Sequence, residues 1–220
     1  MAENPYSSNS EPVYHKRRST LPIPLRHFEG LTQMIVMIRA TNGAGKSTIV
    51  RKVMEKYEKI TTIRYPKGME KKKPMGYICS RNSDTRHLFI PGHYEIANGG
   101  IDTMPSLDYA YQMIFRHHEL GSDVLAEGKN FNDGLQRILS LYARKLDIRV
   151  MFIDHPVVAC IEAVRNRGHT IRPETIIRLA DKCEKEFKTL SRVGVQCNIL
   201  PREEALDQIQ KWLGVGDVSQ

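Results

Sequence analysis

The chain has 220 residues, a length that suits one large α/β domain and suffices to bury a core. No apolar run approaches the roughly 20 residues that a membrane-spanning helix requires, so we expect no membrane partner. The four cysteines are scattered and form no Cys-x-x-Cys pair, which predicts reduced thiols and argues against a zinc site. The N-terminus lacks the basic and then apolar stretch of a secretory signal. Together with the reduced cysteines, this favours a cytoplasmic protein.

Residues 1–28 are rich in Ser, Pro and Asn, and we expect them to form a flexible tail ahead of one domain over residues 29–220. The net charge of +8 is concentrated inside that domain. Residues 51–90 hold eleven Lys/Arg against four Asp/Glu, which is nearly the whole excess. This basic segment is either a solvated surface or the contact for an anionic partner other than a nucleotide.

The first predicted strand leads into a phosphate-binding loop. Residues 33–39 form a mostly apolar run, as a buried parallel strand does, and a helix is expected from Ser47 to Tyr57. Between them lies Ala40-Thr41-Asn42-Gly43-Ala44-Gly45-Lys46-Ser47-Thr48. It departs from the Gly-x-x-x-x-Gly-Lys-Ser/Thr pattern only in having Ala at the first position, and strand, Gly-rich turn and helix are the context that this pattern needs.

This loop predicts a nucleoside triphosphate and Mg²⁺ as ligands. Backbone N–H groups and the helix N-terminus attract polyphosphate. Lys46 is expected to reach the β- and γ-phosphates, and Ser47 to bind the Mg²⁺ that accompanies ATP. The residues assigned to nucleotide binding are Asn42, Gly43, Ala44, Gly45, Lys46, Ser47 and Thr48.

Three short strands are predicted next, over residues 60–65, 75–80 and 86–90, with a lysine-rich loop over residues 67–74. Residues 91–103 then have no periodicity but carry many polar groups beside Gly99-Gly100, which is typical of a functional loop. An Ω-type loop without a chemical role is the alternative. The residues expected to bind the acceptor of the phosphate are Arg64, Tyr65, His93, Tyr94, Glu95 and Asn98. Asp102 or Glu95 is expected to take the proton of its hydroxyl.

The rest of the chain alternates helices with buried strands. Helices are predicted over residues 106–120 with Ser106 as N-cap, 132–145, 156–164, 173–193 and 201–213, and strands over residues 123–128, 148–154 and 195–200. This alternation predicts an α/β fold with a mostly parallel sheet, helices on both faces, and a small lid and insertion loops.

Polar residues that follow the strands are the remaining candidates, because ligands bind beyond the carboxyl ends of parallel strands. Glu127 is expected to hold Mg²⁺ or to polarise the attacking hydroxyl, and Asp154 either binds the metal or orients the turn that follows it. Arg165 and Arg167 flank a break between two helices, where they either close over the nucleotide as a lid or only decorate a helix end. The predicted catalytic residues are therefore Lys46, Asp102, Glu127, Arg165 and Arg167, and the predicted metal ligands are Ser47 and Asp154.

The phosphate loop, Arg64-Tyr65-Pro66, Glu127-Gly128 and Arg165-x-Arg167 together resemble the nucleoside and nucleotide kinases of the P-loop group, over roughly residues 33–213. A narrower resemblance is carried by residues 92–95, 99–103, 152–156 and 160–162. These segments resemble bacteriophage P-loop kinases that act on 5-hydroxymethyluracil in DNA. That resemblance implies ATP and modified DNA as partners and a location in the cytoplasm of the infected bacterium.

Two other functions compete with this one. A kinase for free deoxynucleosides or their monophosphates would use the basic segment for acceptor phosphates only. A non-kinase ATPase or a nucleic-acid-binding module would form no phosphorylated product, and the short chain without a second NTPase module argues against it. The oligomeric state is left open by the sequence.

Overall fold

The computed structural model describes residues 33–69, 71–82, 86–96, 99–128 and 134–216, so the predicted tail over residues 1–28 lies outside the described part. Its strands are β1 (Met34–Arg39), β2 (Lys59–Ile63), β3 (Gly76–Ser80), β4 (Leu88–Pro91), β5 (Asp123–Glu127), β6 (Asp147–Asp154) and β7 (Gln196–Pro201). Its helices are α1 (Lys46–Met54), η1 (Ile101–Thr103), α2 (Leu107–Glu119), α3 (Gly134–Ala143), α4 (Val157–Asn166), α5 (Pro173–Arg192) and α6 (Arg202–Trp212).

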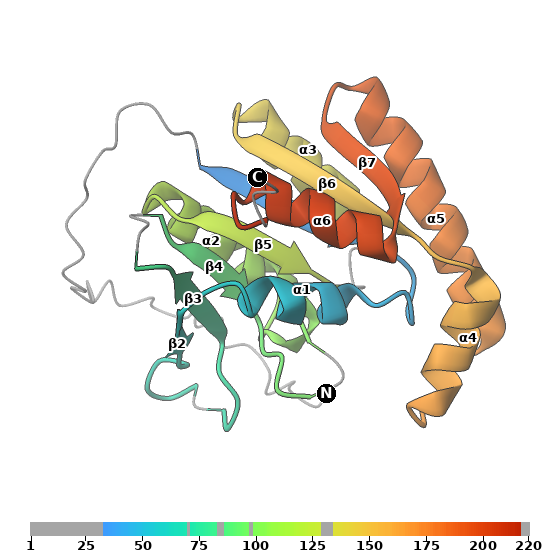
Figure 1. The fold of residues 1–220 in the computed structure, drawn as a ribbon, viewed down its shortest axis with the longest axis horizontal. Helices are drawn as coiled ribbons and strands as arrows, with labels where there is room; N and C mark the ends of the chain where they lie inside the picture. Colours follow the sequence, from blue (N-terminus) through green and yellow to red (C-terminus); the bar gives the residue numbers. More distant parts are fainter. Residues whose placement is uncertain (1–32, 70, 83–85, 97–98, 129–133, 217–220) are drawn as a thin grey trace, which may run out of the picture.

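The seven strands form one sheet in the order β2-β3-β4-β5-β1-β6-β7 (Figure 1). Pairing is parallel from β4 through β5, β1 and β6 to β7. It is antiparallel between β2 and β3 and between β3 and β4, so β3 alone of the described strands runs against the rest. The predicted α/β fold with a mostly parallel sheet is confirmed. Among the described residues, no helix is both long and apolar enough to cross a membrane.

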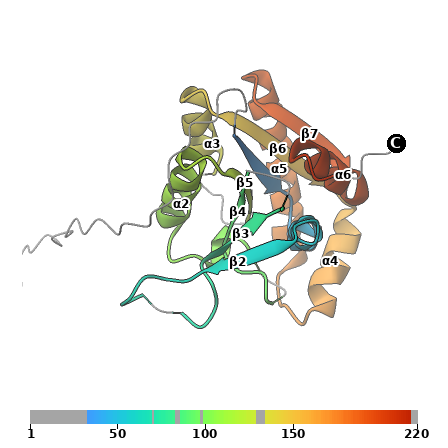
Figure 2. The same cartoon turned by 60° about the vertical axis from the view of Figure 1, so that its left-hand side comes forward.

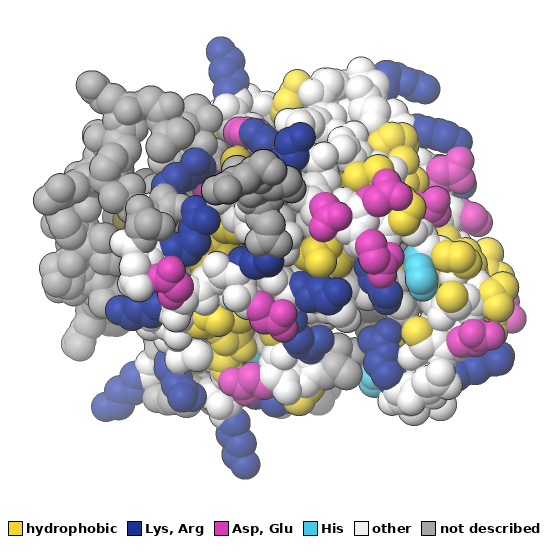
Figure 3. Space-filling view, viewed as in Figure 1, with side chains coloured by type: hydrophobic (Ala, Val, Ile, Leu, Met, Phe, Trp, Pro, Cys, Tyr) yellow, Lys and Arg dark blue, Asp and Glu magenta, His cyan; other side chains and the backbone are white. Residues whose placement is uncertain are grey.

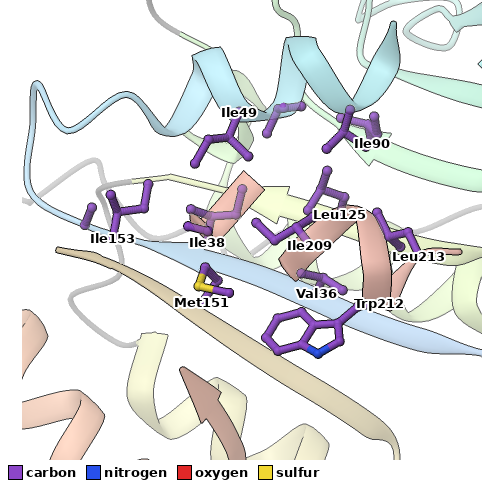
Figure 4. Packing of buried hydrophobic residues seen from close by; sticks show 14 of the residues in the cluster. Val36, Ile38, Ile49, Ile90, Leu125, Met151, Ile153, Ile209, Trp212 and Leu213 are labelled. Carbon is purple, nitrogen blue, oxygen red and sulfur yellow. The ribbon is translucent and has the colours of Figure 1, made fainter. Parts of the chain in front are cut away.

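β1 lies in the middle of the sheet and is buried on both faces, as its apolar run predicts. Val36 and Ile38 point to the face covered by α1 and α6, where they pack with Ile49 and Ile209 (Figure 4). Alternate side chains of β1 point to the opposite face, into a second apolar cluster built with α2 and α3. The turned view shows these two helix pairs on opposite sides of the sheet (Figure 2).

The insertion between α1 and β4 is an antiparallel hairpin at the sheet edge, formed by two of the short strands that the sequence predicts without a helix between them. β2 is the outermost strand, and its residues are almost all exposed. β3 by contrast is largely buried beside β4. β2 nevertheless runs in the same direction as β1. Arg64 and Tyr65 therefore follow β2 at the same end of the strands at which the phosphate loop follows β1.

The predicted helix ends agree closely with the structure. Ser106 is the N-cap of α2, and its side chain accepts a hydrogen bond of 3.1 Å from the backbone N–H of Tyr109. Pro173 is the first residue of α5, as a proline at the start of a helix should be. Pro156 and Pro201 precede the first residues of α4 and α6.

A buried ion pair connects β1 to α5. The Arg39 guanidinium donates to the Glu186 carboxylate, and both side chains are about 5% exposed. Lys182, one turn earlier on α5, lies 3.8 Å from the same carboxylate. This pair holds the C-terminal half of α5 against the end of β1, next to the phosphate loop. Near the start of α5, the Thr41 hydroxyl donates to the Ile176 carbonyl over 2.9 Å.

Replacing Glu186 by Leu should lower the free energy of unfolding by roughly 3–5 kcal/mol, because it removes the carboxylate that neutralises a buried guanidinium. The double variant Arg39→Met/Glu186→Leu should recover most of that loss, because it removes both charges and fills the space with apolar groups. Urea denaturation of the two variants and of Arg39→Met measures this cycle. Additive losses in the double variant would show that the pair does not couple the two elements.

Candidate functional site

The phosphate loop connects β1 to α1 and depends on two glycines with left-handed backbone. Gly43 has φ of 90° and Gly45, the N-cap of α1, has φ of 89°. A Cβ on Gly43 would lie 2.3 Å from the carbonyl oxygen of Cys160 in α4, so this turn also packs too closely for any side chain. The first turn of α1 therefore points its free N–H groups into the space where a polyphosphate is expected.

Lys46 and Ser47 begin α1 and face the strand-end carboxylate of β5. The register of the parallel pair β1 and β5 sets Ile38 opposite Glu127, two residues before the loop begins. The Ser47 hydroxyl donates to Glu127 Oε1 over 2.7 Å. The Lys46 Nζ donates to the carbonyl oxygens of Ala40 and Thr41, each over 3.0 Å. Its ammonium thus lies against the loop, in position to contact phosphate oxygens.

Burial shifts both ionisable groups toward their neutral forms. Burial lowers the pKa of Lys46, and the nearby Glu127 charge partly opposes that shift. Burial raises the pKa of the Glu127 carboxyl, and Lys46 and the Ser47 hydrogen bond oppose it. A bound phosphate would stabilise the buried Lys46 ammonium, and a bound cation would stabilise the buried Glu127 carboxylate. The electrostatics of the site therefore suit a metal–nucleotide complex.

The polar loop that follows β4 packs directly onto Glu127. Gly100 has φ of 82° and ψ of −166°, a conformation that is essentially restricted to glycine, and a Cβ there would lie 2.2 Å from the Glu127 carbonyl oxygen. This contact carries η1 to the end of β5, where Asp102 faces Gly128 closely enough that a Cβ on Gly128 would lie 3.1 Å from Asp102 Oδ1. The Thr103 hydroxyl donates to the Gly100 carbonyl over 2.7 Å and fixes the turn.

These elements enclose a polar cleft of about 670 Å³. The cleft is lined by the phosphate loop, by η1 and the residue Gly99 before it, by the end of β5, by the junction of α4 and α5, and by the start of α6. The lining residues are Asn42, Gly43, Gly45, Lys46, Ser47, Thr48, Arg51, Gly99, Asp102, Thr103, Glu127, Ala163, Val164, Arg167, His169, Thr170, Ile171 and Arg202. The cleft thus brings Asp102 and Glu127 together with the phosphate loop, as the sequence predicts.

The two arginines of the predicted lid are separated by the structure. Arg167, at the C-cap of α4, lines the cleft, and its Nε donates to the Ala163 carbonyl over 3.0 Å. Arg165 is exposed and does not line the cleft. Of these two arginines, only Arg167 is placed to meet the charge of a bound nucleotide, so Arg165 does not keep the role that we expected for it.

Asp154 is also separated from the site. It ends β6, which pairs with β1 on the side opposite β5, and its side chain is exposed outside the cleft. The Ser47 hydroxyl pairs instead with Glu127. Ser47 and Glu127 offer two oxygen atoms within the cleft, the ligand type that Mg²⁺ prefers. The residues present therefore fit a magnesium ion held through Ser47 and Glu127, and the metal assignment of Asp154 is replaced.

The predicted acceptor-binding residues fall into three groups. Tyr65 and His93 line a second, smaller cavity next to the cleft. Arg64 and Glu95 are exposed outside both cavities, and Asn98 lies outside the described residues. Tyr94 belongs to the apolar core, with its ring centroid 6.3 Å from that of Tyr77. A ring buried in this way cannot stack on a base, so the expectation that Tyr94 contacts the acceptor is corrected.

Three cleft residues with basic side chains were not predicted from the sequence. Arg51 lies one helical turn after Ser47 on the same face of α1, a spacing that signals its position, and its Nε donates to the Tyr94 carbonyl over 3.0 Å. Arg202 directly follows β7, so the rule that selected Glu127 also selects it, and its side chain packs on Gly45. His169 follows α4 at the helix break, where no sequence pattern marks it.

Replacing Glu127 by Gln should stabilise the nucleotide-free protein at pH 8. The pKa of this carboxyl is raised in the folded state, so the stability that the protonated carboxyl contributes is fully present below the unfolded-state pKa. That stability is lost as the pH rises through the folded-state pKa. The gain of the variant should therefore shrink as the pH falls toward 4. Urea denaturation across this range measures it, with the exposed Glu162→Gln as control. A variant less stable than the parent at pH 8 would contradict the assignment.

Comparisons with known proteins place the chain in a family. No protein-family model matches it. The 5-hmdU DNA kinase of Pseudomonas phage PaMx11 is 32% identical to it over 142 residues, which are 64% of this chain and 73% of the phage protein. The structure independently gives the α/β fold and the phosphate loop that a P-loop kinase requires. Because the similarity spans more than two thirds of that relative, the chain belongs to the family of the 5-hmdU DNA kinases.

Proposed function

We propose that this protein transfers the γ-phosphate of ATP to the hydroxymethyl oxygen of 5-hydroxymethyluracil in DNA. The observation that carries the proposal is the single cleft in which the phosphate loop meets Glu127 and Asp102. The name of the phage relative supports the acceptor. In the reaction, the hydroxymethyl oxygen forms a bond to the γ-phosphorus, the bond to the β,γ-bridging oxygen breaks, and ADP leaves.

Positioning of the triphosphate falls to the phosphate loop. The N–H groups of the loop and of the first turn of α1 hold phosphate oxygens, and Lys46 leaves the carbonyl oxygens of Ala40 and Thr41 to contact the β- and γ-phosphates. Mg²⁺, held through Ser47 and Glu127, would neutralise charge on the β- and γ-phosphate oxygens. Arg167 and Arg202 border the same cleft and stabilise the charge that spreads over the transferred group.

Asp102 is the residue that we assign to the acceptor hydroxyl. It is half-buried in η1, on the side of the cleft that faces the phosphate loop, and it lies close enough to influence the charge of Lys46 and Glu127. From there its carboxylate accepts the hydroxyl proton as the phosphorus–oxygen bond forms. Glu127, already bound to Ser47, serves the metal instead. In duplex DNA the modified base has to leave the stack to reach this group.

Labelled ATP should transfer its γ-phosphate to an oligonucleotide that contains 5-hydroxymethyluracil, and not to the same oligonucleotide with thymine. Replacing Lys46 by Met should reduce the rate at least about 100-fold, because the charge that contacts the transferred phosphate is lost. The exposed Lys52→Met on the same helix is the matched control. Label that appears only on free deoxynucleosides or monophosphates would favour the small-molecule kinase, and ATP hydrolysis without product would favour an ATPase.

Replacing Asp102 by Asn should reduce kcat at least about 100-fold with little change in the KM for ATP, since the amide cannot take the proton of the acceptor hydroxyl. Single-turnover transfer to the modified oligonucleotide measures the chemical step. Asp207→Asn, an exposed substitution on α6, controls for the change of net charge. Transfer at a near-normal rate in Asp102→Asn would show that another group takes the proton.

A further inference from the structure

A second cavity, of about 370 Å³, lies beside the nucleotide cleft and takes no part in the chemistry proposed above. It is lined by Tyr65, Lys71, Lys72, Lys73, His93 and Thr103. Lys71 and Lys72 are exposed and Lys73 is half-buried, so three lysine side chains line one opening. Lys71 lies 5.2 Å from the centre of the Tyr65 ring. Figure 3 shows Lys and Arg side chains projecting from the lower left of the molecule, where Figure 1 places β2 and β3.

His93 adds an unused polar group to this cavity. Its side chain is about 8% exposed, and among the described residues its Nδ1 has no hydrogen-bond partner. Burial lowers the pKa of His93, and Lys73 lowers it further while Glu95 opposes them, so the environment favours the neutral ring. A buried ring nitrogen without a partner costs free energy, which a ligand in the cavity would recover by accepting a hydrogen bond from it.

The two cavities share a wall. Thr103 lines both of them, and its Oγ1 accepts a 3.1 Å hydrogen bond from the His93 backbone N–H. The Tyr65 hydroxyl reaches the Thr103 carbonyl over 3.4 Å. Asp102, directly before Thr103, faces the nucleotide side. A group held by the lysines is therefore separated from the reacting centre by only one short loop, at the end of the cleft away from α4 and α6.

We propose that this lysine-lined cavity binds a phosphodiester of the acceptor DNA next to the modified nucleotide. The lysines supply the positive charge, and the tautomer of the neutral His93 ring that carries its proton on Nδ1 donates a hydrogen bond to a phosphate oxygen. This inference rests on the proposed function, because it takes the acceptor to be DNA. A monophosphate of a free nucleotide has the same chemistry, but a nucleic-acid strand offers the three lysines its neighbouring phosphates as further contacts.

The triple variant Lys71→Ala/Lys72→Ala/Lys73→Ala should weaken binding of a 5-hydroxymethyluracil oligonucleotide at least about tenfold at near-physiological ionic strength. Each lost phosphate contact should also reduce the slope of log K against log salt by about 0.7–0.9. Fluorescence anisotropy without ATP measures both quantities. His93→Phe, which keeps the approximate volume of the ring but loses its nitrogens, should weaken binding several-fold without lowering the thermal unfolding temperature, because the unpartnered buried nitrogen is removed.

The matched control is Lys185→Ala/Lys188→Ala/Lys211→Ala, which removes the same charge from exposed positions on α5 and α6. If the two triple variants bind the oligonucleotide equally well, the assignment of the cavity is wrong. If phosphorylation of the free nucleoside monophosphate suffers as much as that of DNA, the cavity holds a terminal phosphate and the polynucleotide assignment is wrong. A parent enzyme that binds the oligonucleotide through these lysines but transfers no phosphate to it would overturn the proposed function alone.

Discussion

The parallel pairing of β1 with β5 is the constraint on which the site depends. It sets Ile38 opposite Glu127, so a carboxylate at the end of one strand meets the first turn of the helix that follows the other. In that first turn, the Ser47 hydroxyl donates a hydrogen bond of 2.7 Å to the Glu127 carboxylate. A slip of one residue would carry Glu127 to the other face of the sheet and drive apolar side chains of two fully buried strands out of register. Core packing therefore positions the polar site, and the site adds little to the packing.

This placement has an electrostatic cost in the absence of a ligand. Lys46 and Glu127 are both buried, and burial shifts their pKa values toward the uncharged forms. The carbonyl oxygens of Ala40 and Thr41 solvate the ammonium, and the Ser47 hydroxyl solvates the carboxylate. Such groups are oriented before the nucleotide arrives, so less reorganisation is needed when charge develops on the transferred phosphate. The same reasoning explains why the loop tolerates Ala40 at its first position: its contribution is a backbone carbonyl.

The sequence predicted the parts of the site that depend on local pattern. The phosphate loop followed from its motif between a strand and a helix, and Glu127 followed from its place at a strand end. Asp154 satisfies the same rule, yet its side chain is exposed outside the cleft, because a position at a strand end does not fix the direction in which the side chain points. His93 and Tyr94 are adjacent in a loop without periodicity, so no pattern could show that one lines a cavity while the other enters the core. The lysine-lined cavity forms only where the segment between β2 and β3 packs against the loop that follows β4, so it could not be predicted from the sequence either.

The sheet separates the recognition of the two substrates. The nucleotide cleft is built on the central strands β1 and β5, where every residue is buried and a change in one side chain disturbs the core. The lysines lie between β2 and β3, and β2 is an exposed edge strand that contributes little to the core. Substitutions there change charge without changing packing. Thr103 and Gly100 connect the two regions, since one lines both cavities and the other fixes the loop against Glu127. Choice of acceptor can therefore vary at the edge of the sheet while the chemistry at its centre stays constant.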